Sequence, residues 1–324
     1  MSQFTKSFLV TGGTGGLGLH ASREIAQRYP NAAVVIASRK DKDGAAALIN
    51  EQLGQSNVRF MPLNLGDFKD IRTFVETWAD QNLPPISALL LNAAVQFAEG
   101  GPVYTTDGIE ATFGIGHVGH ALLFHLLQPY LADECRIVIT ASGVHDPEQT
   151  KGMPLPHYTT AEEVAHPTGD LPKQPGRQRY STTKLCNVLW TYALGRRLEQ
   201  IPHKKWTVVA MDPGLMPGTG LARDAGPVLR FLWLKVLPHI IPVLRVLISP
   251  NVHLPKDSGT NLAWVAVDES QRTTSAVYYE GKRQIKSSVD SYNEAWQEDL
   301  WSWTVNAVAA ADDERRHFGL VGGS

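Results

Sequence analysis

The sequence predicts an α/β protein whose single domain is built on a doubly wound parallel sheet. The first observation is a series of short apolar runs without polar alternation, which is typical of strands buried on both faces. These runs lie at 8–10, 33–37, 58–65, 88–91, 137–140 and 208–211. The second observation is that amphipathic stretches separate them, the clearest at 66–80, 107–131 and 180–200. Right-handed crossovers between such strands and helices produce a doubly wound sheet. By length alone, a chain of 324 residues could form one domain or two. The order of the motifs described below favours a single domain.

The composition is that of an ordinary globular protein, and it narrows the class of partner. With 43% hydrophobic residues, 19% charged residues and a net charge of −2, the chain has no basic block, so we expect no nucleic acid as partner. Cys135 and Cys186 lack metal-ligand spacing, and we expect no bound metal. So few cysteines fit a reducing, cytoplasmic setting, and the first residues contain no apolar run of signal-peptide length.

The first apolar run leads directly into a glycine-rich turn. Small residues in such a turn let a pyrophosphate approach the free N–H groups and the positive dipole end of the following helix. The alternative is a tight strand-to-helix turn without a ligand. The candidate cofactor-binding residues here are Thr11, Gly12, Thr14, Gly16, Leu17 and Gly18.

The end of the second apolar run indicates which dinucleotide binds. A fold that prefers NAD usually places an acid about 20 residues after the glycines, on the ribose 2′-hydroxyl. The sequence has Ser38, Arg39 and Lys40 at this point. Two cations and a hydroxyl suit a 2′-phosphate, which predicts NADP(H) as the cofactor. The alternative is a pair of solvated surface cations.

The strongest catalytic candidates are Tyr180 and Lys184. They are four residues apart in a predicted helix and therefore share one of its faces. An ordinary phenol titrates near pH ~10, and a neighbouring cation lowers its pKa towards the range in which it exchanges protons. The same spacing also occurs in ordinary amphipathic helices, so the interpretation depends on what surrounds the pair.

Those surroundings are the carboxyl edge of the predicted sheet, where ligands bind in open α/β folds. Parallel strands bring the residues that follow each run to this edge, beside the glycine turn. These residues are Asn92, Ala93 and Ala94, then Ser142, then Asp212, Pro213 and Gly214.

In their order and spacing these motifs resemble those of the short-chain dehydrogenase/reductase family, from about residue 6 to about residue 290. The resemblance implies a Rossmann fold. The stretches 91–95 and 180–190 look like the branch of retinol dehydrogenases and protochlorophyllide reductases.

The resemblance also implies the roles of individual residues. Tyr180 would be the general acid in reduction, Lys184 would bind the nicotinamide ribose and lower the pKa of Tyr180, and Ser142 would hydrogen-bond to the substrate oxygen. Further cofactor contacts are implied for Asn64, Leu65, Asn92, Ala93, Ala94, Pro213, Gly214 and Met216.

Two positions depart from the family pattern. Gly116 stands where the family has the asparagine of its catalytic tetrad, and this leaves an additional water, a substituting side chain or weak turnover as alternatives. Asn64 stands where an aspartate is common beside the adenine, and its amide can make an equivalent hydrogen bond.

Several residues suggest other chemistry, which we reject. His117, His120 and His125 have no carboxylate or cysteine at ligand spacing, so we expect packing or capping roles. Ser142 lacks the GxSxG elbow of serine hydrolases. Cys186 is expected to be a small buried residue of its helix.

The extra length of the chain lies in two regions. Residues 143–179 are rich in proline, which predicts an extended insertion beside the substrate mouth. Within a predicted substrate loop, 215–255, the apolar segment 227–250 has no uncharged run longer than nine residues, so it is too short to span a membrane. Apolar side chains of the loop 215–255 are expected to form the walls of a hydrophobic site. They are Leu215, Met216, Phe231, Leu232, Trp233 and Leu234.

A competing interpretation of this segment is peripheral membrane contact, because Trp233 lies among Arg230, Lys235 and Arg245. The predicted function is that of an NADP(H)-dependent oxidoreductase interconverting a carbonyl and an alcohol on a bulky hydrophobic small molecule. The alternatives are a cofactor-binding regulatory or scaffold protein with weakened catalysis, and a reductase of activated carbon–carbon double bonds. A homo-oligomer is compatible with the sequence.

Overall fold

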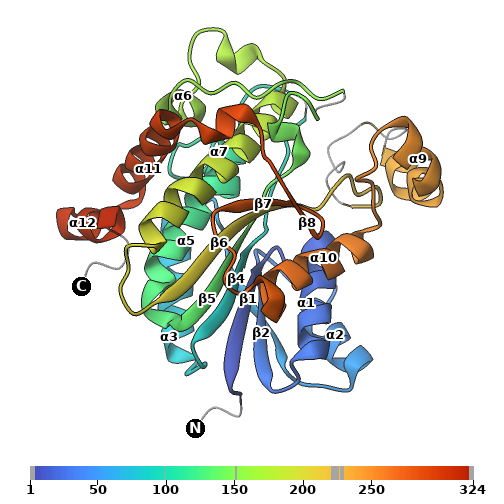
Figure 1. Ribbon diagram of the computed structural model, residues 1–324, viewed down its shortest axis with the longest axis vertical. Coiled ribbons are helices and arrows are strands. Elements are labelled where there is room, and N and C mark those ends of the chain that lie inside the picture. Colours follow the sequence, from blue (N-terminus) through green and yellow to red (C-terminus); the bar gives the residue numbers. More distant parts are fainter. Residues whose placement is uncertain (1–3, 99, 150–151, 220–225, 227–229, 321–324) are drawn as a thin grey trace.

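The structure, a computed structural model, describes residues 4–98, 100–149, 152–219, 226 and 230–320. Within them eight strands form one sheet in the order β3-β2-β1-β4-β5-β6-β7-β8 (Figure 1). The strands are β1 (Lys6–Thr11), β2 (Ala32–Ser38), β3 (Val58–Pro62), β4 (Ile86–Leu91), β5 (Leu131–Thr140), β6 (Lys205–Asp212), β7 (Val277–Glu280) and β8 (Arg283–Ile285). Neighbours are parallel up to β7, and β8 pairs antiparallel with β7. The predicted doubly wound α/β sheet is confirmed, with one antiparallel strand at its edge.

Helices cover both faces of the sheet. One face carries α1 (Gly16–Arg28), α2 (Ala45–Leu53) and α10 (Pro255–Val267). The other carries α3 (Phe68–Asp80), α5 (Gly119–Leu127), α7 (Gly176–Leu198) and α11 (Glu294–Val308). Alternation along β1 shows the division, because Phe8 and Val10 pack against the first group and Leu9 against the second. With both faces covered, the ends of the strands are left for a ligand.

Some predicted elements differ in extent. Helix α7 begins at Gly176, four residues before the predicted start. The predicted helix 107–131 is divided into α4 (Ala111–Phe113), a π-helical segment (Gly114–Val118) and α5, and β5 already begins at Leu131. Strands β7 and β8 were not predicted, because they are short and carry polar side chains among their apolar ones.

The proline-rich insertion packs mainly on the C-terminal part of the chain. Its longest described helix before α7 is α6 (Ala161–Ala165). The Asp299 carboxylate, on α11, accepts hydrogen bonds from the Tyr158 hydroxyl and the Ala161 N–H, both at 2.7 Å. Trp303 Nε1 donates to Glu162 at 2.6 Å. The second half of the insertion is therefore tied to α11, while Gly143, Val144, Gln149 and Met153 line the cavity described below.

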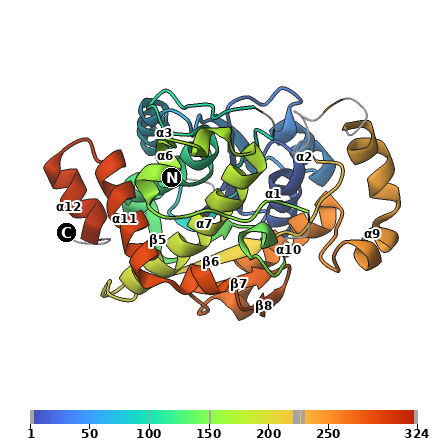
Figure 2. The same cartoon turned by 90° about the horizontal axis from the view of Figure 1, so that it is seen from above.

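The two ends of the molecule are formed by α9 (Ile241–Leu247) and α12 (Asp312–Leu320), which lie far apart in both views (Figures 1 and 2). Part of the predicted apolar segment and substrate loop, 220–225 and 227–229, lies outside the described residues, as do 150–151 of the insertion. Across the described part of the chain, no helix combines the length and the apolar character needed to cross a bilayer.

Candidate active site

The carboxyl ends of the strands open into one large cavity of about 1410 Å³. Pockets for single ligands usually measure roughly 300–1,000 Å³, so this cavity has room for a dinucleotide and a second molecule. The predicted site residues that line it are Gly12, Thr14, Gly16, Leu17, Ser38, Arg39, Lys40, Asn64, Leu65, Asn92, Ala93, Ala94, Ser142, Tyr180, Lys184, Pro213, Gly214 and Met216. Thr11 and Gly18 are not part of its lining and lie behind the wall.

The glycine turn has the backbone geometry that a pyrophosphate requires. Gly12 and Gly16 have φ angles of 68° and 51°, in the left-handed region that favours glycine. Helix α1 begins at Gly16 with no acidic residue in its first turn, so nothing there opposes an anion. Gly18 has a packing role, because a Cβ atom on it would lie 2.4 Å from the Gly12 carbonyl oxygen. The turn therefore fits a dinucleotide.

The end of the cavity beside β2 carries the two predicted cations. Arg39 and Lys40 follow β2, are exposed, and make no ion pair with any residue that the structure describes. The nearby acid Asp41 is engaged elsewhere, because its carboxylate accepts from the N–H groups of Ala45 at 2.7 Å and Ala46 at 3.3 Å. A phosphate placed here would thus meet two available cations.

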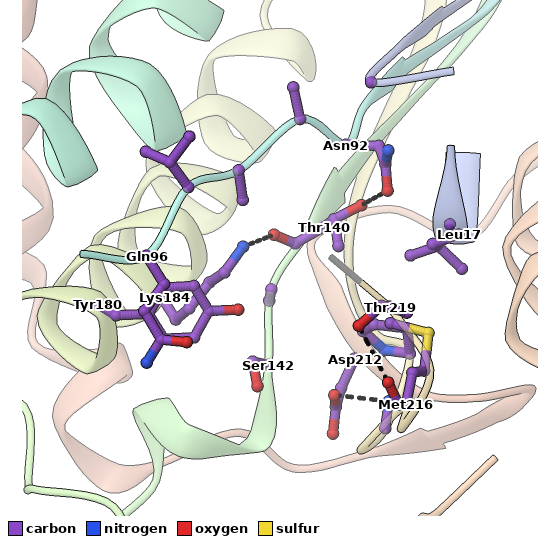
Figure 3. A pocket seen from close by; sticks show the side chains of 18 of the residues that line it. Leu17, Asn92, Gln96, Thr140, Ser142, Tyr180, Lys184, Asp212, Met216 and Thr219 are labelled. Atoms are coloured by element: carbon purple, nitrogen blue, oxygen red, sulfur yellow. Dashed lines mark hydrogen bonds between the residues drawn. The ribbon is translucent and has the colours of Figure 1, made fainter. Parts of the chain in front are cut away.

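Tyr180 and Lys184 lie on the face of α7 that forms the cavity wall (Figure 3). The Lys184 ammonium donates to the Thr140 carbonyl oxygen at 2.8 Å and lies 5.4 Å from the centre of the Tyr180 ring. Burial lowers the pKa of Lys184 to about 8, although the Asp212 carboxylate acts in the opposite direction. Ser142, just beyond β5, lines the same cavity, so the three predicted catalytic residues are brought together.

The pKa of the Tyr180 phenol departs from the sequence-based expectation. Burial raises it, and the carboxylate of Asp212 raises it further. The expected lowering by Lys184 does not dominate, because the ammonium lies over the ring and is bonded to Thr140.

Gly116 opens no space at its own position. It lies in the π-helical segment, and a Cβ atom on it would be 2.8 Å from the Thr183 methyl group. Thr183 precedes Lys184 on α7 and is buried. The methyl of Thr183 therefore approaches the point that a Cβ atom at this position would take.

His120 is the side chain that binds the Gly116 backbone. Its Nδ1 lies 3.3 Å from the Gly116 carbonyl oxygen, and its Nε2 lies 2.9 Å from the Thr11 hydroxyl. A carbonyl only accepts, so Nδ1 carries the hydrogen and the Thr11 hydroxyl donates to Nε2. Burial lowers the pKa of His120 to about 4, which agrees with this neutral form. Thr11 and His120 thus join the glycine turn to the π-helical segment from behind the cavity wall.

The other two histidines pack in the core. His117 stacks on Phe113 and contacts the Thr304 hydroxyl at 3.0 Å. His125 stacks on Phe318 and contacts the Gln128 amide at 3.2 Å. Burial lowers the pKa of each to about 3, so both are neutral packing residues.

Asp212 is a functional candidate to which the sequence assigned no role. It ends β6, is buried, and projects into the cavity (Figure 3). Its carboxylate accepts from the Gly214 N–H at 2.9 Å and from the Asn251 amide at 2.8 Å. Burial raises its pKa to about 6. Asp212 therefore joins two loops of the cavity, and its carboxylate acts to raise the pKa of both Tyr180 and Lys184.

Other lining residues carried no sequence signal. Many come from segments without a motif, and the polar ones include Gln96, Gln149, Arg177, Glu280 and Arg283. Glu280 and Arg283 belong to the unpredicted strands β7 and β8, so they could not have been placed without the sheet order.

Comparisons with known proteins agree with this geometry. A family model described as short chain dehydrogenase matches residues 6–161. A chloroplastic protochlorophyllide reductase of Daucus carota is 27% identical over 303 residues, covering 89% of this chain and 73% of that protein. A polyprenol dehydrogenase of Danio rerio is 28% identical over 311 residues, covering 94% and 86%. Among solved structures, the angucycline C-6 ketoreductase LanV with bound NADP has a TM-score of 0.61 at 18% identity, covering 86% of this chain and 96% of that one. At that identity the likeness shows the fold alone.

The contact between Gly116 and Thr183 predicts opposite effects of one substitution in two backgrounds. Gly116→Ala should lower the free energy of unfolding by about 1–3 kcal/mol, because its methyl meets the Thr183 methyl. In a Thr183→Ser background, which keeps the hydroxyl bonded to the Arg179 carbonyl, the same change should be neutral or stabilise by about 0.4–1 kcal/mol. Urea denaturation measures both; equal effects in the two backgrounds contradict the assignment.

The raised pKa of Asp212 predicts a pH-dependent stability. Its folded pKa of about 6 exceeds the ordinary 3.8, so between these values the folded state binds more protons than the unfolded state. The unfolding free energy of the wild type, minus that of Asp212→Asn, should therefore fall as pH rises from 4 to 6, by on the order of 3 kcal/mol, and level off above. Asp133→Asn is the control, because Lys204 lowers the pKa of Asp133, so its difference curve should be nearly flat from pH 4 to 6 and should fall only on further acidification. A flat Asp212 difference curve would refute the assignment.

Proposed function

The chain belongs to the short-chain dehydrogenase/reductase family of nucleotide-binding oxidoreductases, and we propose that it interconverts a carbonyl and an alcohol on a bulky hydrophobic small molecule with NADP(H). The observation that carries this proposal is the meeting of Ser142, Tyr180 and Lys184 in a cavity that continues to the glycine turn. One cavity thus holds a proton donor and a dinucleotide site.

Each residue has a step that its position supports. In the reductive direction the Tyr180 hydroxyl gives its proton to the substrate oxygen, and the Ser142 hydroxyl donates a hydrogen bond to that oxygen as negative charge develops. The raised phenol pKa favours the protonated form, which is the form a proton donor needs. The bound cofactor supplies the hydride. Lys184, fixed on the Thr140 carbonyl, keeps two further N–H donors for the ribose.

The preference for NADP(H) is supported by Arg39 and Lys40. Both are exposed at the adenosine end of the cavity, and Asp41 is turned towards α2. The Ser38 hydroxyl lies beside them. A 2′-phosphate would meet three donors there, while the carboxylate of the adjacent Asp41 is already bonded to the start of α2.

The hydrophobic substrate is supported by the apolar side of the cavity. Of the predicted wall residues, Leu215, Met216 and Trp233 line it, together with Ile248. Phe231, Leu232 and Leu234 are not part of the lining, and the first two are exposed. Fewer of the predicted residues thus form the cavity wall than the sequence suggested, but those that do are apolar.

A second candidate reaction is reduction of an activated carbon–carbon double bond. The similarity to a protochlorophyllide reductase over 89% of this chain favours it. Separating the products of a lipophilic enone by chromatography distinguishes an allylic alcohol from a saturated ketone. Tight NADPH binding without oxidation of cofactor by any substrate would instead support a regulatory role.

Replacing the proton donor tests the proposed function. Tyr180→Phe should lower kcat for a lipophilic ketone by about 10²-fold or more, because general acid catalysis contributes that much. NADPH binding, followed by fluorescence, should persist. The matched control is Tyr278→Phe, a buried tyrosine outside the cavity whose hydroxyl makes no hydrogen bond with any described residue. Wild-type turnover by Tyr180→Phe would sink the mechanism.

Replacing Arg39 tests the cofactor assignment. Arg39→Ala should raise the Kd for NADPH by roughly 10- to 100-fold, the loss of one charge-assisted contact, and leave that for NADH nearly unchanged. The control is Lys205→Ala, which removes an exposed cation at the start of β6, at the end of the sheet away from the cavity. It should leave the Kd for NADPH and the Kd for NADH unchanged. Equal weakening for both cofactors contradicts a 2′-phosphate site.

A further inference from the structure

Helix α9 presents apolar side chains on two sides. Its inner side, Ile241 and Leu244, packs in a small cluster with Val252. Its outer side consists of Val243, Val246 and Leu247, which are spaced by three and four residues and so share a face. Val246 is 84% exposed and Leu247 is 73% exposed. A helix that is apolar on two sides normally has a partner on both, and this one has a partner on one.

The exposed apolar surface extends beyond the helix. Of the thirteen large hydrophobic side chains exposed among the described residues, seven lie between residues 230 and 254. Besides the three on α9 they are Phe231, Leu232, Ile240 and Leu254. More than half of such residues in so short a segment mark an interaction surface rather than scattered exposure.

The charges of the same segment have one sign. No aspartate or glutamate occurs from residue 225 to residue 256. Arg230, Lys235, Arg245 and Lys256 lie there and all are exposed. This surface combines apolar side chains with cations and has no carboxylates. It therefore complements a bilayer, whose apolar interior is covered by anionic headgroups when acidic lipids are present.

A second copy of the chain fits this surface less well. A two-fold axis through the face would bring this patch, which carries Arg230, Lys235 and Arg245 and no carboxylate, against an identical patch, and like charges oppose such an interface. A bilayer has no such conflict.

We propose that residues 230–254 dock the protein on an anionic lipid surface, with Val243, Val246 and Leu247 inserted at the boundary between headgroups and acyl chains. The segment is also the roof of the cavity, because Trp233, Ile248 and Pro250 line it from within. Trp233 Nε1 donates to the Thr219 carbonyl oxygen at 3.0 Å and so fixes the roof to the loop after β6. An apolar substrate dissolved in the membrane would then lie next to its entrance, a consequence that rests on the proposed function, whereas docking itself does not.

Vesicle sedimentation tests the proposal. The full chain is mixed with vesicles of phosphatidylcholine alone or with phosphatidylserine added. We expect binding to the mixed vesicles that weakens with salt, and a partition constant reduced roughly tenfold or more by Val246→Glu. The matched control is Val289→Glu, because Val289 is 83% exposed on another part of the surface and should bind as wild type does. Lys235→Glu should weaken binding to the mixed vesicles only.

Several outcomes would overturn the proposal. These are absence of binding to the mixed vesicles, equal loss in Val246→Glu and Val289→Glu, or a dimer in light scattering that Val246→Glu dissociates, which would assign the face to a second copy. Thermal midpoints and NADPH binding measured on both variants verify the fold independently of the reaction. Failure of ketone turnover would leave vesicle binding unaffected, so the two proposals fail separately.

Discussion

One backbone carbonyl, that of Thr140 at the end of β5, sets the position of the reacting side chains. It accepts from the Lys184 ammonium at 2.8 Å and from the Asn187 amide at 3.2 Å, and these two donors lie one turn apart on α7. The helix is thereby held at a fixed rotation and height against the strand. Since Ser142 follows Thr140 by two residues and Tyr180 precedes Lys184 by one turn, the same contact fixes both donors relative to each other.

From this carbonyl a line of polar contacts crosses the ends of the central strands. The Thr140 hydroxyl donates to the Asn92 side chain at 3.4 Å, and the Asn92 amide donates to the Thr11 carbonyl at 2.8 Å. The Thr11 hydroxyl reaches His120, which reaches the carbonyl of Gly116. Buried polar groups of this kind specify an arrangement strongly when every partner is present, and they are costly when one is lost. The glycine turn and helix α7 are therefore connected by one continuous line of hydrogen bonds.

The sequence was sufficient for what local pattern determines. The apolar runs placed the sheet, and the spacing of Tyr180 and Lys184 placed both on one wall, because period and register are local properties. It was insufficient for properties that depend on residues far away in the sequence. The pKa of Tyr180 is raised instead of lowered, first because tertiary packing buries the phenol and second because the Asp212 carboxylate at the end of β6 lies near it. The Gly116 position is approached by Thr183, a residue 67 positions later that packs across from another helix. Strands β7 and β8 are too short to show a period of their own.

The floor and the roof of the cavity are held in place by different kinds of contact. Its floor is the polar line described above, anchored in strands that pack on both faces in extensive cores. Its roof is held by the small separate cluster of Ile241, Leu244 and Val252, with Leu215, Leu237 and Ile248 against it. Displacing the roof disrupts that cluster and a few loop contacts, such as the hydrogen bond from Trp233 to Thr219, whereas displacing the floor breaks buried hydrogen bonds across the sheet, so the roof is the part of lower local stability. A ligand that took the proposed route past α9 would therefore leave the proposed catalytic groups in place.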